Sequence, residues 1–447
     1  MLLSLSRIEL PNALGIATEL QKMKILIYGL NFSPELTGIG KYTGEMAAWL
    51  TKQGHKVRVV TAPPYYPAWA VSSGYSSTRW QREQWHGVDV WRCPLWVPCR
   101  PGGLKRLIHL ASFALGSLPV MLRQIFWRAD MVWVVEPALF CAPTACLVAR
   151  LSGAKAWLHI QDFEIDAAFE LGLLRGKRLR ALVVGCERWL MQRFDVVSTI
   201  SNRMLDKLVA KGINADKAFF APNWVDISAI SPRAPAAGLS PYRQELGIST
   251  DRVVALYSGN MGAKQGLEIL SDIAQMHEAS EGYAEGTHSN KSVPLAFVFC
   301  GDGAGRAGLQ AQCAGLKHVY FLPLQPFDRL NDLLAMADIH LLPQRADAAD
   351  LVMPSKLTGM LASGKPVVAT AHPSTELARV VLGSGPDMAC GLVVPPENAG
   401  LMLAAITELA KSAPTRQRMG ATARAYAEQY LHIDMVLGQL AKQMQKL

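Results

Sequence analysis

The stretch RVVALYSGNMGAKQGLEIL, residues 252–270, predicts a buried strand, a glycine-rich turn and the start of a helix. Its Val, Ala and Leu residues run without polar alternation, as expected for a parallel strand that is covered on both faces. A glycine-rich turn between strand and helix brings backbone N–H groups and the positive end of the helix dipole to one point. The stretch therefore predicts an α/β fold with an anion site where its strands end.

The same alternation of apolar runs and helical patterns extends through both halves of the chain. Buried strands are expected at Lys24–Gly29, Lys56–Thr61, Met131–Val135, Ala156–Ile160 and Asp195–Ile200, and again at Arg252–Ser258, Pro294–Cys300, Val319–Phe321, Ile339–Leu342 and Pro366–Thr370. Helices are expected near 40–53, 103–127, 138–151, 178–193 and 202–211, and near 265–279, 304–315, 327–336, 355–363 and 374–382. Two such halves predict two doubly wound Rossmann-like domains that face each other across a cleft.

A segment rich in proline and glycine, residues 232–241, separates the two halves and is typical of a linker. The opening residues do not resemble the start of a domain, because Arg7 and Glu9 interrupt any apolar leader. We expect a non-native or disordered extension at 1–22 ahead of a natural start at Met23. The domains are then 23–225, a linker at 226–242, a second domain at 243–414 and closing helices at 415–447.

The chain has 447 residues, a net charge of +9 and eight cysteines. Half of its residues are hydrophobic, which excludes a disordered chain. The basic charge favours an anionic partner: a nucleotide diphosphate, a phospholipid or a nucleic acid. No Cys-x-x-Cys or His-Glu-x-x-His pattern occurs, so neither a structural metal site nor a disulfide framework is expected. Cysteines in apolar stretches and the lack of a convincing signal peptide point to the cytoplasm.

The longest apolar stretch outside the strands is LIHLASFALGSLPVML, residues 107–122. It is shorter than the roughly 20 residues that cross a bilayer, and it contains His109 and Pro119. Around it, the region from Arg79 to Arg128 holds eight Lys and Arg residues and five Trp residues. This composition is typical of a helix at a membrane surface, and equally of a core helix with a solvated basic rim.

In the first half, the turn after the first strand leads to Gly38, Ile39 and Gly40 at the start of a helix. Such glycines let backbone N–H groups approach a phosphate or a transferred group closely. A dinucleotide fingerprint is disfavoured, because its glycines follow the strand at once. It also requires an acidic residue after the second strand, where the chain has Thr61-Ala62-Pro63. NAD is therefore not expected.

Three turns of the second half follow strands at the same edge of the expected sheet. They contain Gly259, Asn260, Gly262 and Lys264, then Gly301, Asp302 and Gly303, and finally Ser355 and Lys356 at the start of a helix. A lysine beside a helix N-terminus is suited to neutralise a diphosphate leaving group. Each lysine alone is also compatible with a solvated surface charge, but three such turns together favour a binding site.

Six motifs in order carry a family resemblance: FSPELTGIGKYTGEMAAWL, GHKVRVVTAPPYYP, APNWVD, YSGNMGAKQGLEIL, GDG and MPSKLTGMLASGKPVVAT. They resemble those of retaining glycosyltransferases of family 4, with the GT-B architecture, and are most similar to colanic-acid-type exopolysaccharide enzymes. The resemblance covers residues 23–447. It implies transfer of a sugar from a nucleotide diphosphate, with retained anomeric configuration and without a metal or other cofactor. The first domain would bind the acceptor and the second the donor, and residues 415–447 would cross back to the first.

The resemblance transfers to the donor side only in part. Lys264 matches the donor-phosphate lysine of the family, whereas Asn260 stands where an arginine is usual. The Glu-x7-Glu pair of many members is absent, since its positions hold Leu351 and Gly359. Lys356 fits the Pro-Ser-Lys of a subset of exopolysaccharide enzymes. We take Glu376 as the substitute for ribose recognition, and Gly259, Gly262, Gly301, Asp302, Gly303 and Ser355 as further donor-binding residues.

On the acceptor side, His159-Ile160-Gln161-Asp162 closes a strand where relatives often have His-Asp. Asp162 matches the acidic residue and is expected to hold a hydroxyl or take its proton. A helix N-cap is its alternative role. Gln161 replaces the histidine and is expected to position the acceptor or the transferred sugar, together with the Gly38–Gly40 turn. His159 is expected in the core.

The resemblance therefore predicts a glycosyltransferase that moves a sugar such as fucose from a GDP-linked donor to a polyprenyl-diphosphate-linked oligosaccharide. It would act in the cytoplasm, peripheral at the inner face of the plasma membrane, with the basic Trp-rich region toward the lipid. Two alternatives remain open, a nucleotide-sugar 2-epimerase on the same architecture and a degenerate scaffold that binds polysaccharide. A nucleic-acid partner is not expected, because the sequence has no recognition-helix module or RNA-stacking motif.

Overall fold

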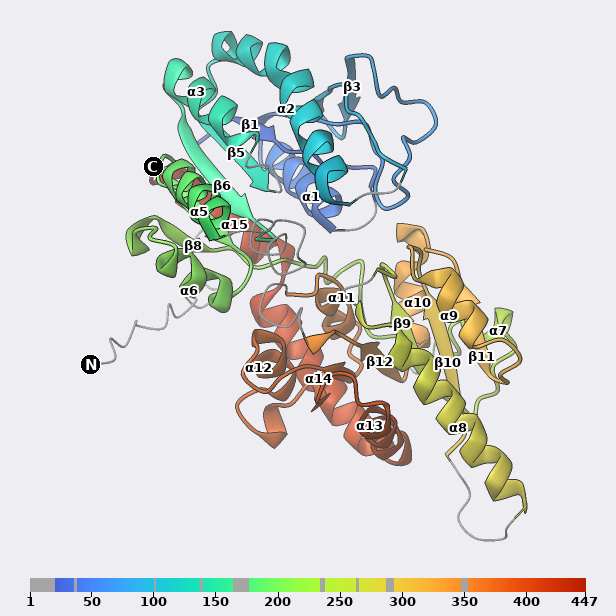
Figure 1. Ribbon diagram of the computed structural model, residues 1–447. Coiled ribbons are helices and arrows are strands. Elements are labelled where there is room, and N and C mark those ends of the chain that lie inside the picture. The colour runs from blue at the N-terminus through green and yellow to red at the C-terminus, as the bar shows by residue number, and fades with distance from the viewer. Residues whose placement is uncertain are drawn as a thin grey trace.

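The computed structural model describes residues 21–35, 38–99, 102–136, 140–163, 177–233, 238–262, 265–286, 293–346 and 353–447. Within these residues the two halves of the chain each form one sheet with helices on both of its faces (Figure 1). The α/β class and the two doubly wound sheets expected from the sequence are confirmed. Residues 1–20 of the expected extension lie outside the described residues.

The first sheet has the strand order β3-β4-β2-β1-β5-β6-β7-β8. β3 pairs antiparallel with β4, and the other neighbouring pairs are parallel. Both faces of β1 are fully buried, as an uninterrupted apolar strand requires. The strands are β1 (Lys24–Tyr28), β2 (Lys56–Thr61), β3 (Gln81–Trp85), β4 (Val88–Arg92), β5 (Met131–Glu136), β6 (Lys155–Ile160), β7 (Val196–Thr199) and β8 (Ala218–Phe220).

Alternate residues of β1 point into two different cores, as strand geometry dictates. Leu26 and Tyr28 pack under α2 (Gly103–Gln124), α3 (Ala142–Ser152), α5 (Lys177–Met191) and α6 (Asn202–Ala210). Ile25 and Ile27 pack under α1 (Gly38–Lys52) and α15 (Ile433–Gln445). The last helix of the chain thus completes the first half, and Figure 1 shows it in red beside the blue and green elements.

The second sheet is parallel throughout, in the order β11-β10-β9-β12-β13-β14. Its strands are β9 (Val253–Ser258), β10 (Leu295–Cys300), β11 (Val319–Leu322), β12 (Ile339–Leu342), β13 (Val367–Thr370) and β14 (Gly391–Val394). One face packs on α7 (Pro241–Glu245), α10 (Leu330–Met336), α11 (Lys356–Ala362), α12 (Glu376–Leu382) and α14 (Ala413–Tyr430). The other packs on α8 (Glu268–Gly286), α9 (Arg306–Gln312) and α13 (Ala399–Lys411). The domain boundaries drawn from the sequence remain predictions.

The structure contains elements that the apolar pattern does not predict. β3 is a polar edge strand, QREQW, whose residues alternate between half-buried and exposed. β8 has only three residues, and β14 and α13 lie beyond the last predicted strand. The helix expected near 265–279 extends further, because α8 continues to Gly286. His277 is buried there, and its Nε2 accepts from the backbone N–H of Leu295 at 3.4 Å. Residues 287–292 lie outside the described residues.

Candidate functional site

Two glycine loops of the second sheet pack backbone against backbone at the ends of β9 and β10. The N–H of Gly259 donates to the carbonyl of Cys300 at 3.0 Å, and that of Met261 to the carbonyl of Asp302 at 2.8 Å. Gly303 has φ +140°, and a Cβ there would lie 2.6 Å from the carbonyl oxygen of Met261. A Cβ at Gly301 would lie 1.9 Å from the carbonyl oxygen of Gly259. The predicted donor-binding glycines are therefore brought together, and both loops depend on their missing side chains.

Lys356, the first residue of α11, lies against these loops. Its Nζ donates to the Tyr257 hydroxyl at 3.0 Å and lies 4.1 Å from the centre of that ring. The Tyr257 hydroxyl in turn donates to the carbonyl of Asn260 at 2.5 Å. In the described part of the chain no carboxylate pairs with this amine, and burial lowers its pKa to about 7. The lysine is thus held at the glycine loops without a negative partner of its own.

The glycine turn of the first half is built around a buried carboxylate instead. Oε1 of Glu35 accepts from the backbone N–H groups of Tyr65 and Tyr66 at 3.1 and 3.0 Å, and Oε2 accepts from Asn31 Nδ2 at 2.9 Å. A Cβ at Gly40 would lie 2.6 Å from Glu35 Oε2, so α1 begins against this side chain. Burial raises the pKa of Glu35, while the three donors act in the opposite direction.

The two glycine regions meet at Tyr66. Its hydroxyl accepts from Asn260 Nδ2 at 3.1 Å, so the loop held by Glu35 contacts the first glycine loop of the second sheet. Burial chiefly raises the pKa of Tyr66, with Arg106 lowering it and the carboxylates of Glu35 and Asp162 raising it further. The predicted acceptor residue Asp162 thus acts electrostatically on the same hydroxyl.

A second contact between the halves joins α1 to α11. The Tyr42 hydroxyl donates to the carbonyl of Ser355 at 3.1 Å and lies 3.3 Å from the hydroxyl of Thr358. Trp224 of the APNWVD motif packs edge-on against the Tyr42 ring, with 5.2 Å between the two ring centres. The Gly38–Gly40 turn and the Ser355–Lys356 turn thus belong to helices that contact each other directly.

Gln161 lies in a buried hydrogen-bonded row at the end of β6. Its Nε2 lies 3.3 Å from Nε2 of His159, and Nδ1 of His159 lies 2.9 Å from Oγ of Ser198. Burial lowers the pKa of His159 to about 3, so its ring is neutral at physiological pH. A neutral ring fits this row when Gln161 donates to Nε2 and the Nδ1 proton is donated to Ser198. His159 is a core residue, as expected, and its contact fixes Gln161.

The hydrogen bonds and ion pair described for Glu376 involve no residue of the glycine loops. Its carboxylate pairs with Arg379 and accepts from Asn202 Nδ2 at 3.1 Å. It lines a pocket of about 290 Å³ together with Arg203 and residues 373–383. The contacts of the described residues therefore associate Glu376 with α6 of the first half. Lys264 lies outside the described residues.

Sequence reasoning missed three residues that organise the site: Glu35, Tyr66 and Tyr257. Glu35 and Tyr66 stand within quoted motifs, FSPELTGIG and APPYYP, yet neither motif shows which side chain turns inward. Tyr257 ends an apolar strand, where an aromatic residue is ordinarily part of the core. A polar or aromatic residue next to a glycine turn is the signal that could have identified Glu35 and Tyr257, whereas no glycine stands beside Tyr66.

Comparison with known proteins agrees with this arrangement. Two family models match, the Glycosyl transferase 4-like domain over residues 37–224 and Glycosyl transferases group 1 over residues 240–426. The chain is 44% identical over 422 residues to WcaI of Escherichia coli (strain K12), a protein named as a colanic acid biosynthesis glycosyl transferase. That match covers 93% of this chain and 98% of WcaI. The chain belongs to this family of glycosyltransferases.

Solved structures show that this glycosyltransferase has the GT-B fold. Sucrose-phosphate synthase from Thermosynechococcus elongatus superposes with a TM-score of 0.71 at 14% identity, covering 95% of this chain and 99% of that one. HepE of Anabaena, in complex with UDP and glucose, superposes with a TM-score of 0.66 at 16% identity. This match covers 95% of this chain and 100% of HepE. Among the described residues of the glycosyltransferase, no group of three or more His, Cys, Asp or Glu could hold a metal ion.

Proposed function

We propose that this glycosyltransferase moves a sugar from a nucleoside diphosphate to an oligosaccharide of exopolysaccharide synthesis, of the colanic acid type. The observation that carries the proposal is the half-buried amine of Lys356, held at two glycine loops without a carboxylate partner among the described residues. A cation of this kind is stabilised by an anion, and the loops let a diphosphate approach the backbone. The name of the relative WcaI supports the pathway. HepE, with the same fold, holds UDP.

For the finer identities we propose a GDP-linked donor, fucose among its sugars, and an acceptor linked to polyprenyl diphosphate. The net charge of +9 suits two diphosphate substrates. The enzyme would act in the cytoplasm, peripheral at the inner face of the plasma membrane, where a lipid-linked acceptor is found.

The proposed reaction retains the anomeric configuration. The bond between the anomeric carbon and the β-phosphate oxygen breaks, and a bond from that carbon to the acceptor hydroxyl oxygen forms on the same face. The acceptor proton passes to the departing diphosphate oxygen. Lys356 and Lys264 stabilise the charge that develops on the diphosphate, and backbone N–H groups of the glycine loops contribute. Asp162 holds the reacting hydroxyl beside Tyr66. In this scheme the lysines take the place of a divalent metal, so chelation with EDTA should leave turnover unchanged.

Thermal melting with GDP, UDP, NAD or no ligand tests donor binding first. A ligand at 100 times its dissociation constant adds about 2.7 kcal/mol of stability, which a melting curve resolves. Stabilisation by GDP alone supports the proposed donor, and stabilisation by UDP alone corrects the base. A response to NAD only, or to no nucleotide, would overturn the proposal.

Product analysis then tests the reaction. With the nucleotide sugar that binds, the enzyme should release nucleoside diphosphate only when a lipid-linked acceptor is present. Proton NMR of the product should show the anomeric configuration of the donor. Isomerised nucleotide sugar without transfer would identify an epimerase, and binding without turnover would identify a scaffold.

A further inference from the structure

The long helix α2 leaves one apolar stripe uncovered. Its exposed members recur every three to four residues or at multiples of that spacing, so they share one side of the helix. The most exposed are Leu104 and Leu115, each at 71%, and Ile108 and Leu122 lie on the same side. Phe126, in the 3-10 turn Ile125–Trp127 that directly follows α2, is 87% exposed. By length and composition, Gly103–Trp127 could cross a membrane. The opposite face, however, is buried in the first core through Leu110, Phe113, Val120 and Met121.

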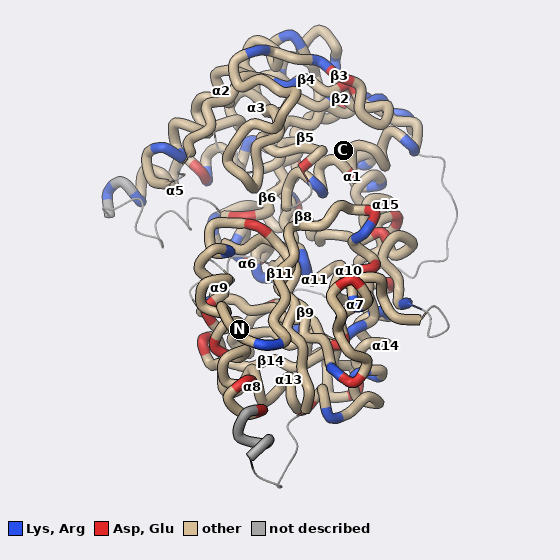
Figure 2. Tube along the Cα trace, turned by 90° about the vertical axis from the view of Figure 1, so that its right-hand side faces the viewer, with Lys and Arg blue, Asp and Glu red and all other residues tan. Residues whose placement is uncertain are grey.

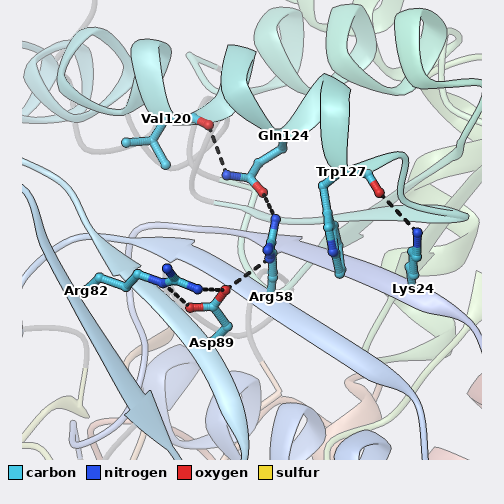
Figure 3. Close-up of polar contacts among 7 residues, drawn as sticks. All are labelled: Lys24, Arg58, Arg82, Asp89, Val120, Gln124 and Trp127. Carbon is cyan, nitrogen blue, oxygen red and sulfur yellow. Dashed lines mark hydrogen bonds and ion pairs between the residues drawn. The ribbon is translucent and has the colours of Figure 1, made fainter.

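Polar contacts hold that inner face firmly to the sheet (Figure 3). Gln124 Oε1 accepts from Arg58 at 3.1 Å, while Arg58 stacks on the Trp127 ring at 4.4 Å. Arg58 and Arg82 both bond to Asp89 of β4, at 3.0 and 2.7 Å. At the middle of α2, Ser117 and Tyr28 are 2.6 Å apart. A helix anchored along its length in this way lies on the domain and does not leave it to span a bilayer.

Neighbouring elements extend the apolar face. α3 packs beside α2, and both lie on the outer side of the first half (Figures 1 and 2). α3 exposes Leu147 and Leu151, the latter at 58%. Trp80 and Trp96 flank α2. The indole N–H of Trp80 donates to the carbonyl of Gly116 at 2.9 Å, and the backbone N–H of Trp96 donates to Ser112 Oγ at 3.0 Å. Both rings are more than 40% exposed, a position typical of Trp at a membrane interface.

The charged residues within α2 and α3 are all basic. The 22 residues of α2 and the 11 of α3 contain no Asp or Glu. Exposed Lys105, Arg106, Arg123, Arg128 and Arg150 lie on these helices or directly after α2. Long basic side chains extend toward anionic headgroups while apolar neighbours enter the acyl boundary. This charge is complementary to an anionic lipid surface.

We propose that the outer face of α2 and α3, with Trp80 and Trp96, docks on anionic phospholipid. The first turn of α2 lies next to the candidate site, because Arg106 acts electrostatically on the Tyr66 hydroxyl. An enzyme docked in this way receives a lipid-linked substrate at the boundary between its two halves. Docking itself is independent of the donor, and only its purpose rests on the proposed function.

Vesicle co-sedimentation of the full chain tests the proposal. The wild type should sediment with vesicles that mix phosphatidylglycerol and phosphatidylethanolamine, and not with phosphatidylcholine alone. Leu115→Glu with Phe126→Glu should lower the partition coefficient by more than about 30-fold, since two exposed apolar anchors are replaced by charges that anionic lipid repels. Lys105→Gln with Arg123→Gln should lower it by about 10-fold or more, at about 1 kcal/mol per cation.

The matched control is Met388→Glu with Leu401→Glu, two exposed apolar positions of the second half that receive the same charges. This control should bind vesicles as the wild type does. Equal binding by the Leu115 and Phe126 double variant, or no binding by the wild type, would overturn the proposal. So would a wild-type dimer that the same variant converts to monomer in sedimentation velocity. Melting shifts with nucleotide report the donor site separately, so failure of docking and failure of the proposed function are distinguishable.

Discussion

The two glycine regions that meet at the boundary between the halves have the same local plan and opposite charge. In both, a buried parallel strand leads to a glycine turn and a helix. In the first half the turn surrounds the carboxylate of Glu35, whose oxygens are occupied by three donors of the protein itself. In the second half the loops face the amine of Lys356, whose partners among the described residues are the Tyr257 hydroxyl and ring.

This difference indicates a division of roles. A buried carboxylate that accepts three hydrogen bonds is internally satisfied and serves to hold a loop in place. A half-buried amine with one neutral partner is incompletely stabilised and gains most when an anion arrives. The second half is therefore suited to bind the diphosphate. The first half is suited to keep its own glycine turn in place beside the second half.

Lys356→Ala should give the largest effect. If this amine stabilises the departing diphosphate, kcat should fall by about 10²- to 10³-fold. Circular dichroism and the melting temperature without ligand should change little, because removing a half-buried amine leaves no unpaired charge behind. Lys411→Ala, an exposed lysine of α13, is the control and should keep full turnover. Unchanged turnover in Lys356→Ala would remove the role assigned to the lysine.

Gly303→Ala tests whether the second half depends on close backbone contact. The added Cβ would lie 2.6 Å from the Met261 carbonyl oxygen at φ +140°, which should cost about 2–4 kcal/mol in the free energy of unfolding. Gly308→Ala in α9 meets nothing within 4 Å and should instead gain about 0.5–1 kcal/mol. Urea unfolding measures both. Equal effects of the two substitutions would contradict the packing described for these loops.

Glu35→Ala applies the same test to the first half. Three donors lose their acceptor, so the variant should be about 2–3 kcal/mol less stable than the wild type. Glu35→Gln keeps an oxygen for the N–H groups of Tyr65 and Tyr66 and should cost only about 1 kcal/mol. Thermal unfolding gives both values, with the half-exposed Glu428→Ala as the control that changes stability little. An equal loss for Gln and Ala would show that charge, not hydrogen bonding, holds the turn.

The pH dependence of donor binding should follow Lys356. Its pKa is about 7 in the free protein, and a bound diphosphate favours the protonated amine. Binding above pH 7 then takes up a proton, so affinity for the nucleoside diphosphate should fall by up to about tenfold per pH unit. The stability of the unliganded protein should change with pH in the opposite direction. Between pH 7 and the ordinary lysine pKa of 10.5, the unfolded chain binds more protons, so stability rises with pH.

Calorimetry in buffers of different ionisation enthalpy measures this proton uptake directly. Lys356→Arg should retain binding without proton uptake, because guanidinium stays charged throughout the range. A flat affinity profile in the wild type would mean that the amine is already protonated before the nucleotide binds.

Tyr66→Phe should give the smallest effect. It removes one hydrogen bond between the halves, worth about 1 kcal/mol or a fivefold loss in nucleotide affinity at most. Tyr75→Phe removes a hydroxyl that bonds to Glu83 within the first half, and it should leave affinity unchanged. Comparison of the two Kd values shows whether contact between the halves supports donor binding.

Much of the fold followed from the apolar strands, because a parallel strand buried on both faces has an unmistakable composition. The polar edge strand β3 did not, since QREQW is half exposed and carries no apolar run. The turns at Gly259, Gly301 and Lys356 were also predictable, because strand ends of one parallel sheet lie on a common edge. Glu376 was predicted to recognise ribose from its place after β13, and only the structure shows that its side chain pairs with Arg379 and accepts from Asn202 of α6.

The sequence alone determined the two sheets, the family and the glycine turns, since each depends on residue order along a short segment. Only the tertiary structure decided that Glu35 is internally satisfied and that Lys356 has no carboxylate partner in the described chain. It alone decided that Tyr66 meets Asn260 and that α2 keeps an uncovered apolar face. These properties depend on side chains from distant segments and on which of them water or another molecule can reach. No local pattern specifies that until the chain has packed.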